Sequence, residues 1–438
     1  MPSIALKASE TPSPSKSSAT SNNTDLNQTL RQVKRRLSNP VLHGETPATL
    51  HTLRSNIDSE NDSNEPRYSP LSIPISRRLQ TAAVLWHTVS IPAFISFVLF
   101  LIGIPMFWIF LAIYIIYNIF DLTPSNGKVT RRYSNFFRDL QIWKYYCQYF
   151  PIRLHKTVDL VPTFSRPSTD KPQSNKSSYE ELISWINPLN WIFGESNRLQ
   201  KTGPTYIFGL HPHGVISLSG FGAVGTNGAE WSSVFPGVPV CLMTLLNQFY
   251  IPFYRDYLLA LGITSSGKEN ALEILKQGFS LGIVVGGAQE SLLAKPDSND
   301  IVLNKRKGFI KLALETGNVG LVPCFCFGEN DLYNILEPGE NSFGQSFQLW
   351  LKRVSGFTIP FFHARGIFNY DFGLLPYRRD VNIVIGEPII VPFLPSASSA
   401  EIDKYHNLYV AGLRKIFADN KGKFKNADGR DYKFNIVE

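Results

Sequence analysis

The pattern of hydrophobic and polar positions divides the chain into three stretches. The first, residues 1–70, is polar: it contains 19 Ser or Thr and a single aromatic residue, Tyr68. The second, Leu79 to Phe120, has 42 residues without one Asp, Glu, Lys or Arg. After residue 121, short apolar runs alternate with amphipathic patterns. We therefore expect a disordered cytosolic tail over 1–70, a membrane segment over 79–120 and an α/β domain facing the cytosol over 121–438.

The uncharged stretch predicts a helical hairpin. A helix that spans a bilayer needs about 20 apolar residues, so this stretch is too long for one helix and long enough for two. Gly103 and Pro105 lie near its middle and predict a turn, and Pro92 is expected to kink or end the first helix. Basic residues flank both ends, which favours both termini in the cytosol: Arg77, Arg78, Lys128, Arg131 and Arg132. The hairpin either spans the membrane or dips into one leaflet, and a buried helix of a soluble protein is the disfavoured alternative.

The apolar and polar pattern of the remaining chain predicts a mixed α/β domain. Two segments have the apolar spacing of amphipathic helices, Glu269–Gln277 and a later one near Ala400–Phe417. Five short apolar runs predict buried strands: Thr205–Leu210, Val238–Met243, Leu281–Gly286, Val319–Phe325 and Val381–Ile385. Strands that alternate with helices predict a largely parallel sheet with helices on its faces.

Composition narrows the class of protein. Charged residues make up 18% of the chain, below the ~25% that is usual for soluble domains, while aromatic residues reach 13%. This favours contact with lipid. The net charge of +8 fits a nucleic-acid binder or a protein on an anionic membrane, and the charge alone does not choose between them. The four cysteines form no CxxC pair, so neither a disulfide framework nor a structural zinc site is expected.

The most informative segment is His211-Pro212-His213-Gly214, which follows an apolar strand directly. Imidazole at a strand end is suited to proton transfer near neutral pH. The adjacent glycine lets the backbone bend or a substrate approach. Two alternatives stay open: a metal site, for which no third ligand cluster is evident nearby, and a pair of structural histidines.

Two further segments carry candidate chemistry. Gly286, Gly287 and Glu290 end another predicted strand, where glycine N–H groups are suited to polarising a carbonyl and the carboxylate to pairing with a histidine. Three cations, Arg306, Lys307 and Lys311, precede or begin a helical pattern and are suited to binding phosphates. The alternatives are a surface carboxylate and an ordinary solvated basic turn.

These motifs together resemble the type-2 diacylglycerol acyltransferase family, in an arrangement like that of its fungal members. The matching segments lie in the family's order behind the hairpin, over about residues 80–438: Tyr149-Phe150-Pro151, His211–Gly214, Gly286-Gly287-x-x-Glu290, and Arg306-x-Gly308-Phe309-x-Lys311 running on to Val322-Pro323 and Phe327-Gly328. The resemblance implies a membrane-anchored α/β acyltransferase domain that acylates 1,2-diacylglycerol with acyl-CoA, with Tyr149, Phe150, Pro151 and Gly214 among the substrate-binding residues.

More distantly, the plan resembles the glycerophospholipid acyltransferases, which carry a His-x4-Asp motif. His213 corresponds to that histidine, but Leu218 stands where the aspartate is expected. Because plant members of the closer family replace the first histidine, the resemblance implies that His213 is the general base and that His211 shapes the site. The orienting carboxylate must come from elsewhere. We expect Glu290 to supply it and to raise the pKa of His213.

The resemblance also implies partners and location. It implies direct transfer without metal, cofactor or covalent acyl-enzyme, in the endoplasmic reticulum membrane or at a lipid-droplet surface, without nucleic acid. Rival functions are transfer to monoacylglycerol, a fatty alcohol or a sterol, and a non-enzymatic droplet protein. A soluble hydrolase is disfavoured, since Ser217 and Ser219 do not lie in a Gly-x-Ser-x-Gly turn. Whether the chain forms homo-oligomers stays open.

Overall fold

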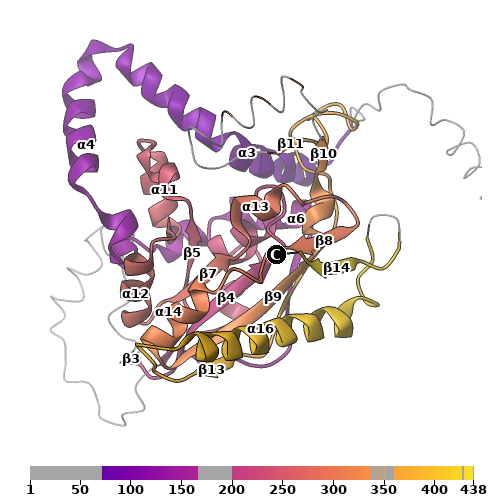
Figure 1. Ribbon diagram of the computed structural model, residues 1–438. Coiled ribbons are helices and arrows are strands. Elements are labelled where there is room, and N and C mark those ends of the chain that lie inside the picture. The colour runs from indigo at the N-terminus through magenta and orange to yellow at the C-terminus, as the bar shows by residue number, and fades with distance from the viewer. Residues whose placement is uncertain are drawn as a thin grey trace, which may run out of the picture. The chain divides into compact units, whose positions relative to one another are not determined.

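The computed structural model describes residues 72–165, 200–336, 342, 346, 350, 360–426 and 429–437 (Figure 1). The predicted tail over residues 1–70 lies outside the described residues. From residue 68 onward the chain forms one compact unit. Its centre is an eight-stranded sheet in the order β1-β12-β9-β4-β7-β5-β6, with β13 also paired to β9.

The sheet is mostly parallel, as predicted. Strands β4, β5, β6, β7 and β9 run in one direction, while β12 and β13 are antiparallel to β9 and β1 is parallel to β12. All five predicted strands are confirmed, with ends that differ by up to two residues. The bounds are β1 Ile152–Lys156, β4 Thr205–His211, β5 Val240–Thr244, β6 Ile263–Ser265, β7 Ser280–Val284, β9 Val319–Phe327, β12 Val381–Ile385 and β13 Ile389–Val391.

Strand β9 shows why the sequence pattern identifies this sheet. All nine of its residues are buried, as expected for a central strand that is covered on both faces. It lies between β4 and β12 and packs against the long C-terminal helix α16. Smaller two-stranded pairs surround the main sheet: β2 Phe164–Ser165 with β3 Gln200–Lys201, β8 Ser298–Ile301 with β14 Lys433–Ile436, and β10 Asn334–Leu336 with β11 Phe361–His363.

Both predicted helices are present. The helix near Ala400–Phe417 is α16, and it begins with a capping box in which Ser398 and Glu401 bond to each other's backbone N–H groups. The helices are α5 Asn135–Arg138, α6 Gln141–Tyr149, α9 Leu218–Gly220, α10 Trp231–Val234, α11 Tyr254–Ala260, α12 Lys268–Lys276, α13 Gly287–Ser291, α14 Gly308–Thr316 and α16 Ser399–Asn420. Shorter turns are η3 Thr123–Ser125, η4 Lys128–Arg131, η6 Phe221–Gly225, η7 Leu246–Tyr250 and η8 Glu329–Leu332.

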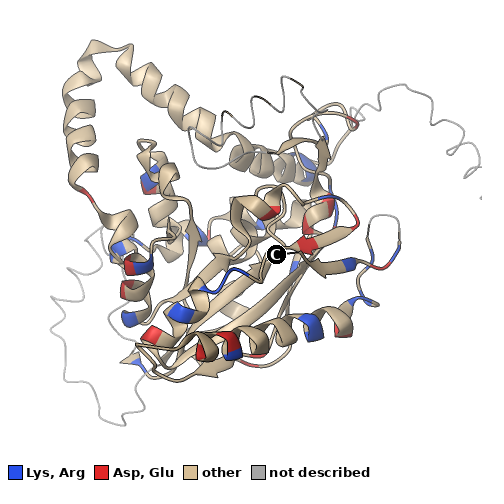
Figure 2. Cartoon of the chain, in the orientation of Figure 1, with Lys and Arg blue, Asp and Glu red and all other residues tan. Residues whose placement is uncertain are grey.

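The uncharged stretch forms two helices, α3 (Ile75–Ile102) and α4 (Trp108–Phe120), joined by the turn η2 (Pro105–Phe107). The predicted turn at Gly103 and Pro105 is confirmed. Pro92 does not end the first helix, since α3 continues through it for ten more residues, to Ile102. Figure 2 shows the hairpin without charge colours from the middle of α3 to the end of α4. By length and composition alone, α3 and the helical segment Pro105–Ser125, which contains α4, are each long and apolar enough to cross a membrane.

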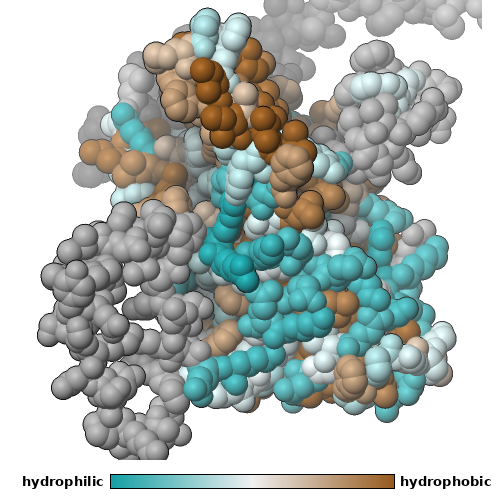
Figure 3. Space-filling model, turned by 90° about the vertical axis from the view of Figure 1, so that its left-hand side faces the viewer, coloured by the Kyte–Doolittle hydropathy of each residue, from teal (hydrophilic) through white to brown (hydrophobic). Residues whose placement is uncertain are grey.

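The two halves of α3 have different surroundings. Its first half packs on α6, and Ala83, Val84 and Ser90 are buried there. Beyond Ser90 the apolar side chains are largely exposed, as they are along α4. Figure 3 shows this hydrophobic surface gathered above the hydrophilic surface of the α/β domain. The hairpin therefore starts inside the domain and leaves it after about half the length of α3.

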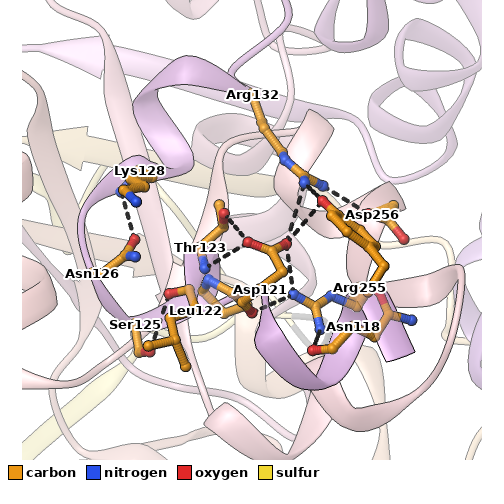
Figure 4. A network of polar contacts seen from close by, with 12 residues as sticks. Asn118, Asp121, Leu122, Thr123, Ser125, Asn126, Lys128, Arg132, Arg255 and Asp256 are labelled. Carbon is orange, nitrogen blue, oxygen red and sulfur yellow. Dashed lines mark hydrogen bonds and ion pairs between the residues drawn. The ribbon is translucent and has the colours of Figure 1, made fainter. Parts of the chain in front are cut away.

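A polar network joins the base of α4 to α11 (Figure 4). The carboxylate of Asp121 accepts hydrogen bonds from Arg255 at 2.9 Å and from Arg132 at 3.2 Å. Arg255 also donates to the carbonyl oxygen of Asn118 at 2.8 Å, and Arg132 donates to Asp256 at 2.7 Å. Because the side chains of Asp121 and Arg255 are only 11% and 6% exposed, this network is the polar attachment of α4 to the domain.

We predict that Asp121→Asn destabilises the protein by about 3 kcal/mol, because it leaves the Arg255 guanidinium buried without its anionic partner. Denaturant unfolding in detergent measures this. The matched control is Asp431→Asn, which removes an ion pair with Lys425 whose side chains are 57% and 46% exposed. Because water and salt screen such an exposed pair, its loss should change stability little. Equal effects of the two substitutions would contradict the structural role of the network.

Candidate active site

The ring of His213, at the end of β4, has a defined orientation. Its Nδ1 lies 2.9 Å from the carbonyl oxygen of Gly214. A carbonyl oxygen can only accept a hydrogen bond, so Nδ1 carries the proton and Nε2 of the neutral ring keeps a lone pair. Burial lowers the pKa of His213, and the bond to Gly214 offsets this only in part. The expected rise of this pKa is therefore not found, and the half-buried ring is neutral near pH 7.

The first histidine of the motif has a different environment. His211 is completely buried, and its Nε2 lies 3.1 Å from the hydroxyl of Tyr409 on α16. That hydroxyl donates to the carbonyl oxygen of Gly209 at 3.2 Å, so Nε2 of His211 is the donor of the pair. A side chain at Gly209 would collide with the same hydroxyl. Burial lowers the pKa of His211 to about 3, so this ring stays neutral and holds the end of β4 against α16.

Glu290, on α13 after β7, is 1% exposed and contacts the motif through the backbone. Its Oε1 accepts the backbone N–H of His213, and its Oε2 accepts the backbone N–H of Val302 at 2.9 Å. Burial raises the pKa of Glu290 to about 7, and these two hydrogen bonds and the charge of Arg306 act in the opposite direction. The carboxylate thus meets His213 as expected, but its hydrogen bond goes to the main chain, while the imidazole bonds to Gly214.

A second buried carboxylate, Glu329, was not predicted. It is 2% exposed and follows β9. Its two oxygens accept the backbone N–H groups of Leu218 at 2.8 Å and Ser219 at 2.9 Å. Burial raises its pKa to about 7. Gly214 has φ +65°, and a side chain there would collide with this carboxylate. A carboxylate therefore does reach position 218, where the distant motif has its aspartate, but it comes from another strand.

The topology explains why these groups meet. Strand β4 pairs in parallel with β7 on one side and with β9 on the other. His213 follows β4, Glu290 follows β7 and Glu329 follows β9, so all three lie at the carboxyl edge of the sheet. The sequence signal for Glu329 was its place after Phe327-Gly328, at the end of an apolar strand. The two carboxylates thus hold the segment from His213 to Ser219 from both sides.

Of the remaining candidate residues, the two glycines and Arg306 lie beside Glu290. Gly286 lies so close to Glu290 that a side chain would collide with it, while Gly287, with φ +60°, faces open space. Arg306 is exposed and donates to the side-chain oxygen of Gln289 on α13 at 3.0 Å, which places it beside the Glu290 turn. The other two cations have acidic neighbours: Lys307 pairs with Asp403, and Lys311 lies 4.0 Å from Glu315.

The segment Tyr149-Phe150-Pro151 lies in the packed core between α6 and β1. The side chains of Tyr149 and Phe150 are buried. The Tyr149 hydroxyl donates to the carbonyl oxygen of Pro376 at 2.7 Å, and the carbonyl oxygen of Pro151 accepts the N–H of Val381 at 3.0 Å. These contacts attach α6 to the sheet, and substrate contact by this segment stays a prediction.

The described residues contain neither an accessible cysteine nor a cluster of metal ligands. All four cysteines are buried and free, and burial raises the pKa of the Cys324 and Cys326 thiols. They are therefore protonated and packed. In the ranges that the structure describes, no three His, Cys, Asp or Glu residues are grouped to hold a metal ion.

Comparison with known proteins identifies the family. The family model described as diacylglycerol acyltransferase matches residues 98–165 and 188–435. The chain is 50% identical over 380 residues to diacylglycerol O-acyltransferase 1 of Eremothecium gossypii, covering 84% of this chain and 80% of that protein. It is 47% identical over 379 residues to diacylglycerol O-acyltransferase 1 of Saccharomyces cerevisiae, covering 84% and 90%. It is also 36% identical over 365 residues to 2-acylglycerol O-acyltransferase 1 of Bos taurus, covering 82% and 96%.

The carboxyl edge of the buried sheet, where a neutral histidine lies between two buried carboxylates, is the candidate active site, and the matched family and relatives make the protein an acyltransferase. The chain belongs to the diacylglycerol acyltransferase family.

The two buried carboxyl groups predict a dependence of stability on pH. A carboxyl group whose pKa is raised from 4.5 to about 7 by folding binds more protons in the folded chain, so the free energy of unfolding decreases as pH rises through this window. His211 and His213, whose pKa values burial lowers, contribute the opposite slope below about pH 6.5. We therefore expect Glu329→Gln to make the apparent melting temperature in detergent fall less, or rise more, than that of the wild type between pH 5 and pH 7.5.

The control is Glu387→Gln, which changes an exposed glutamate in the same way. It should leave the wild-type pH dependence of the melting temperature unchanged. If Glu329→Gln and Glu387→Gln give the wild-type slope alike, Glu329 is not buried as the structure places it.

Proposed function

We propose that the protein transfers an acyl group from acyl-CoA to the free hydroxyl of 1,2-diacylglycerol, with His213 as the general base. The observation that carries the proposal is the free lone pair on Nε2 of a neutral His213, at the carboxyl edge of the sheet. The relatives named diacylglycerol O-acyltransferase, at 47–50% identity over 84% of this chain, support the acceptor.

The reaction follows from this base. Nε2 takes the proton from the hydroxyl of diacylglycerol while the oxygen attacks the thioester carbonyl carbon. This attack forms the new C–O bond of the ester. The C–S bond then breaks, and the imidazolium gives its proton to the CoA thiolate that leaves. General base catalysis of this kind contributes about 10²–10⁴-fold, and holding both substrates together contributes further. No covalent acyl-enzyme is required.

Backbone N–H groups complete the proposed site. Those of Gly214 and of the turn Gly286–Gly287 are the candidates to stabilise the negative charge that develops on the carbonyl oxygen. Glu290 and Glu329 act as positioning residues, because their bonds go to the backbone on either side of Gly214. Their removal would shift His213 rather than remove the base.

Arg306 is the strongest candidate for a contact with the CoA phosphates. It is exposed, it lies beside α13, and its positive charge acts on the nearby Glu290. We assign Lys307 and Lys311 a weaker part, since Asp403 and Glu315 already lie against them. A guanidinium suits this role because it can make paired hydrogen bonds to phosphate oxygens.

One alternative acceptor has a specific observation in its favour. The bovine relative named 2-acylglycerol O-acyltransferase 1 covers 82% of this chain at 36% identity. Monoacylglycerol is therefore the second candidate. Parallel assays with the two acceptors at equal concentrations distinguish the activities.

We further propose that the hairpin dips into one leaflet with both termini in the cytosol, in the endoplasmic reticulum membrane and at lipid-droplet surfaces. The exposed part of α3 beyond Ser90 and the 13 residues of α4 are each about 20 Å long at 1.5 Å per residue. The hydrocarbon core of a bilayer is about 30 Å thick, so these exposed parts are shorter than the core, although the whole of α3 and the segment Pro105–Ser125 have the length to cross it. A hairpin of this length also fits a lipid monolayer.

The histidine substitutions test the proposed base. His213→Ala should lower turnover by about 10²–10⁴-fold, since it removes the proton acceptor. His211→Ala should be milder, because His211 supports the end of β4. The measurement is labelled triacylglycerol formed per unit of this protein in membranes that lack other neutral-lipid synthesis. Wild-type turnover of His213→Ala would contradict the assignment, and loss in His211→Ala alone would exchange the two roles.

The Arg306 assignment predicts a change in substrate binding. Arg306→Gln should raise KM for acyl-CoA about tenfold, equivalent to about 1.4 kcal/mol, with kcat little changed. The control Arg414→Gln removes the same charge from an exposed position on α16. Equal KM values in the two variants would exclude Arg306 from the acyl-CoA site.

A further inference from the structure

A second apolar surface lies beside the hairpin, in the segment that joins β5 to α11. Residues 231–254 contain no Asp, Glu, Lys or Arg. Within them, residues 245–253, which we call the 245–253 loop, contain the turn η7 and expose apolar side chains. Leu245, Leu246 and Tyr250 are 42%, 41% and 72% exposed. Exposed apolar side chains gathered in one short loop mark an interaction surface.

The loop contacts both legs of the hairpin. The ring of Phe253 lies 5.3 Å from that of Phe97 on α3 and stacks on that of Tyr114 on α4, at 4.3 Å between ring centroids. The Tyr114 hydroxyl accepts the backbone N–H of Phe253 at 2.7 Å. Figure 1 shows α11, which follows the loop, inside the opening between α3 and α4.

These contacts give the loop a depth along the hairpin. Phe97 lies seven residues beyond Ser90, where α3 leaves the domain, which is about 10 Å along the helix. Tyr114 lies six residues before the end of α4, which is about 9 Å. The distances along α3 and α4 therefore place Phe253 at about the same depth, roughly 10 Å from the domain. The medium that surrounds the hairpin at this depth also surrounds the loop.

Part of the loop backbone is hydrogen-bonded within the protein. Polar main-chain groups in lipid must be satisfied within the protein. Gln248 donates its N–H to the carbonyl oxygen of Leu245 at 3.3 Å, and Phe253 donates to Tyr114. The first charged residues after the loop, Arg255 and Asp256, bond to groups in the network at the base of α4.

We propose that the 245–253 loop inserts into the same lipid leaflet as the hairpin and forms a third membrane contact. The loop leaves the carboxyl end of β5, which is parallel to β7 and, through it, to β4. It therefore emerges from the edge of the sheet that carries His213. Its insertion turns this edge toward the membrane, so that an acceptor hydroxyl reaches His213 from the lipid. The inference rests on the proposed membrane insertion of the hairpin.

Environment-sensitive fluorophores at single introduced cysteines test this inference. The full chain is reconstituted in phosphatidylcholine vesicles, and the four native cysteines, being buried, give the background measured with the unsubstituted chain. Tyr250→Cys reports the loop and Ile109→Cys, at a position 72% exposed on α4, reports the hairpin. Leu408→Cys, at an apolar position 46% exposed on α16, is the matched control away from the hairpin.

Spin-labelled lipid should quench the labels at positions 250 and 109, and aqueous iodide should not reach them. Iodide should quench the label at position 408, and spin-labelled lipid should not. If 109 is lipid-exposed and 250 behaves as 408 does, the loop inference is overturned and the hairpin stands. If 109 and 250 both behave as 408 does, the hairpin proposal fails and the loop inference fails with it. None of these three outcomes decides the acyl-transfer proposal, which the His213 and Arg306 assays test separately.

Discussion

Two buried carboxylates hold the backbone on which the site depends. Glu290 accepts the N–H of His213, and Glu329 accepts those of Leu218 and Ser219. Each carboxylate is nearly inaccessible to water, and burial of such a group is costly unless hydrogen bonds compensate it. Backbone N–H groups provide that compensation here. The same bonds determine where the chain after β4 runs and hence where the imidazole lies.

This arrangement separates the proposed base, His213, from the two carboxylates that position its backbone. The ring of His213 bonds to the next carbonyl oxygen rather than to a carboxylate, so its proton lies on Nδ1 and its lone pair on Nε2. A carboxylate beside the ring would raise its pKa, whereas burial lowers it. A neutral imidazole can take a proton from an alcohol without first losing one of its own. The proposed insertion of the 245–253 loop would turn this edge of the sheet toward lipid, because the loop leaves the same edge.

Much of the fold could be predicted from local patterns. Continuous apolar runs identify central strands such as β9, and the i, i+3, i+4 spacing identifies α12 and α16. The antiparallel strands β12 and β13 were not predicted to be antiparallel, because direction in a sheet depends on the connections and not on the run itself. Pro92 was expected to kink or end the first helix, and the structure excludes only the second outcome. Its effect on α3 depends on whether the lost hydrogen bond can be tolerated, and the helix continues through it.

The site was harder to predict where it depends on contacts distant in sequence. His213 and Glu290 were recognisable from their motifs, but the atoms that meet were not, since a carboxylate bonds equally well to an imidazole or a backbone N–H. Glu329 lies 111 residues from Leu218 and has no motif of its own beyond the preceding Phe-Gly. Only the adjacency of β4 and β9 brings it to the place of the missing aspartate. The apolar 245–253 loop lies in the uncharged stretch 231–254, but that stretch also contains the buried strand β5, so the pattern alone does not separate contact with lipid from packing in the core.

The tautomer of His213 tests the account most directly. The protein is labelled with ¹⁵N-histidine, and the ring nitrogen resonances near pH 7 are compared with those of His213→Gln, which lacks the signals of His213. We predict a neutral ring with the proton on Nδ1 and a lone pair on Nε2. A ring protonated on Nε2, or on both nitrogens, at that pH would contradict it.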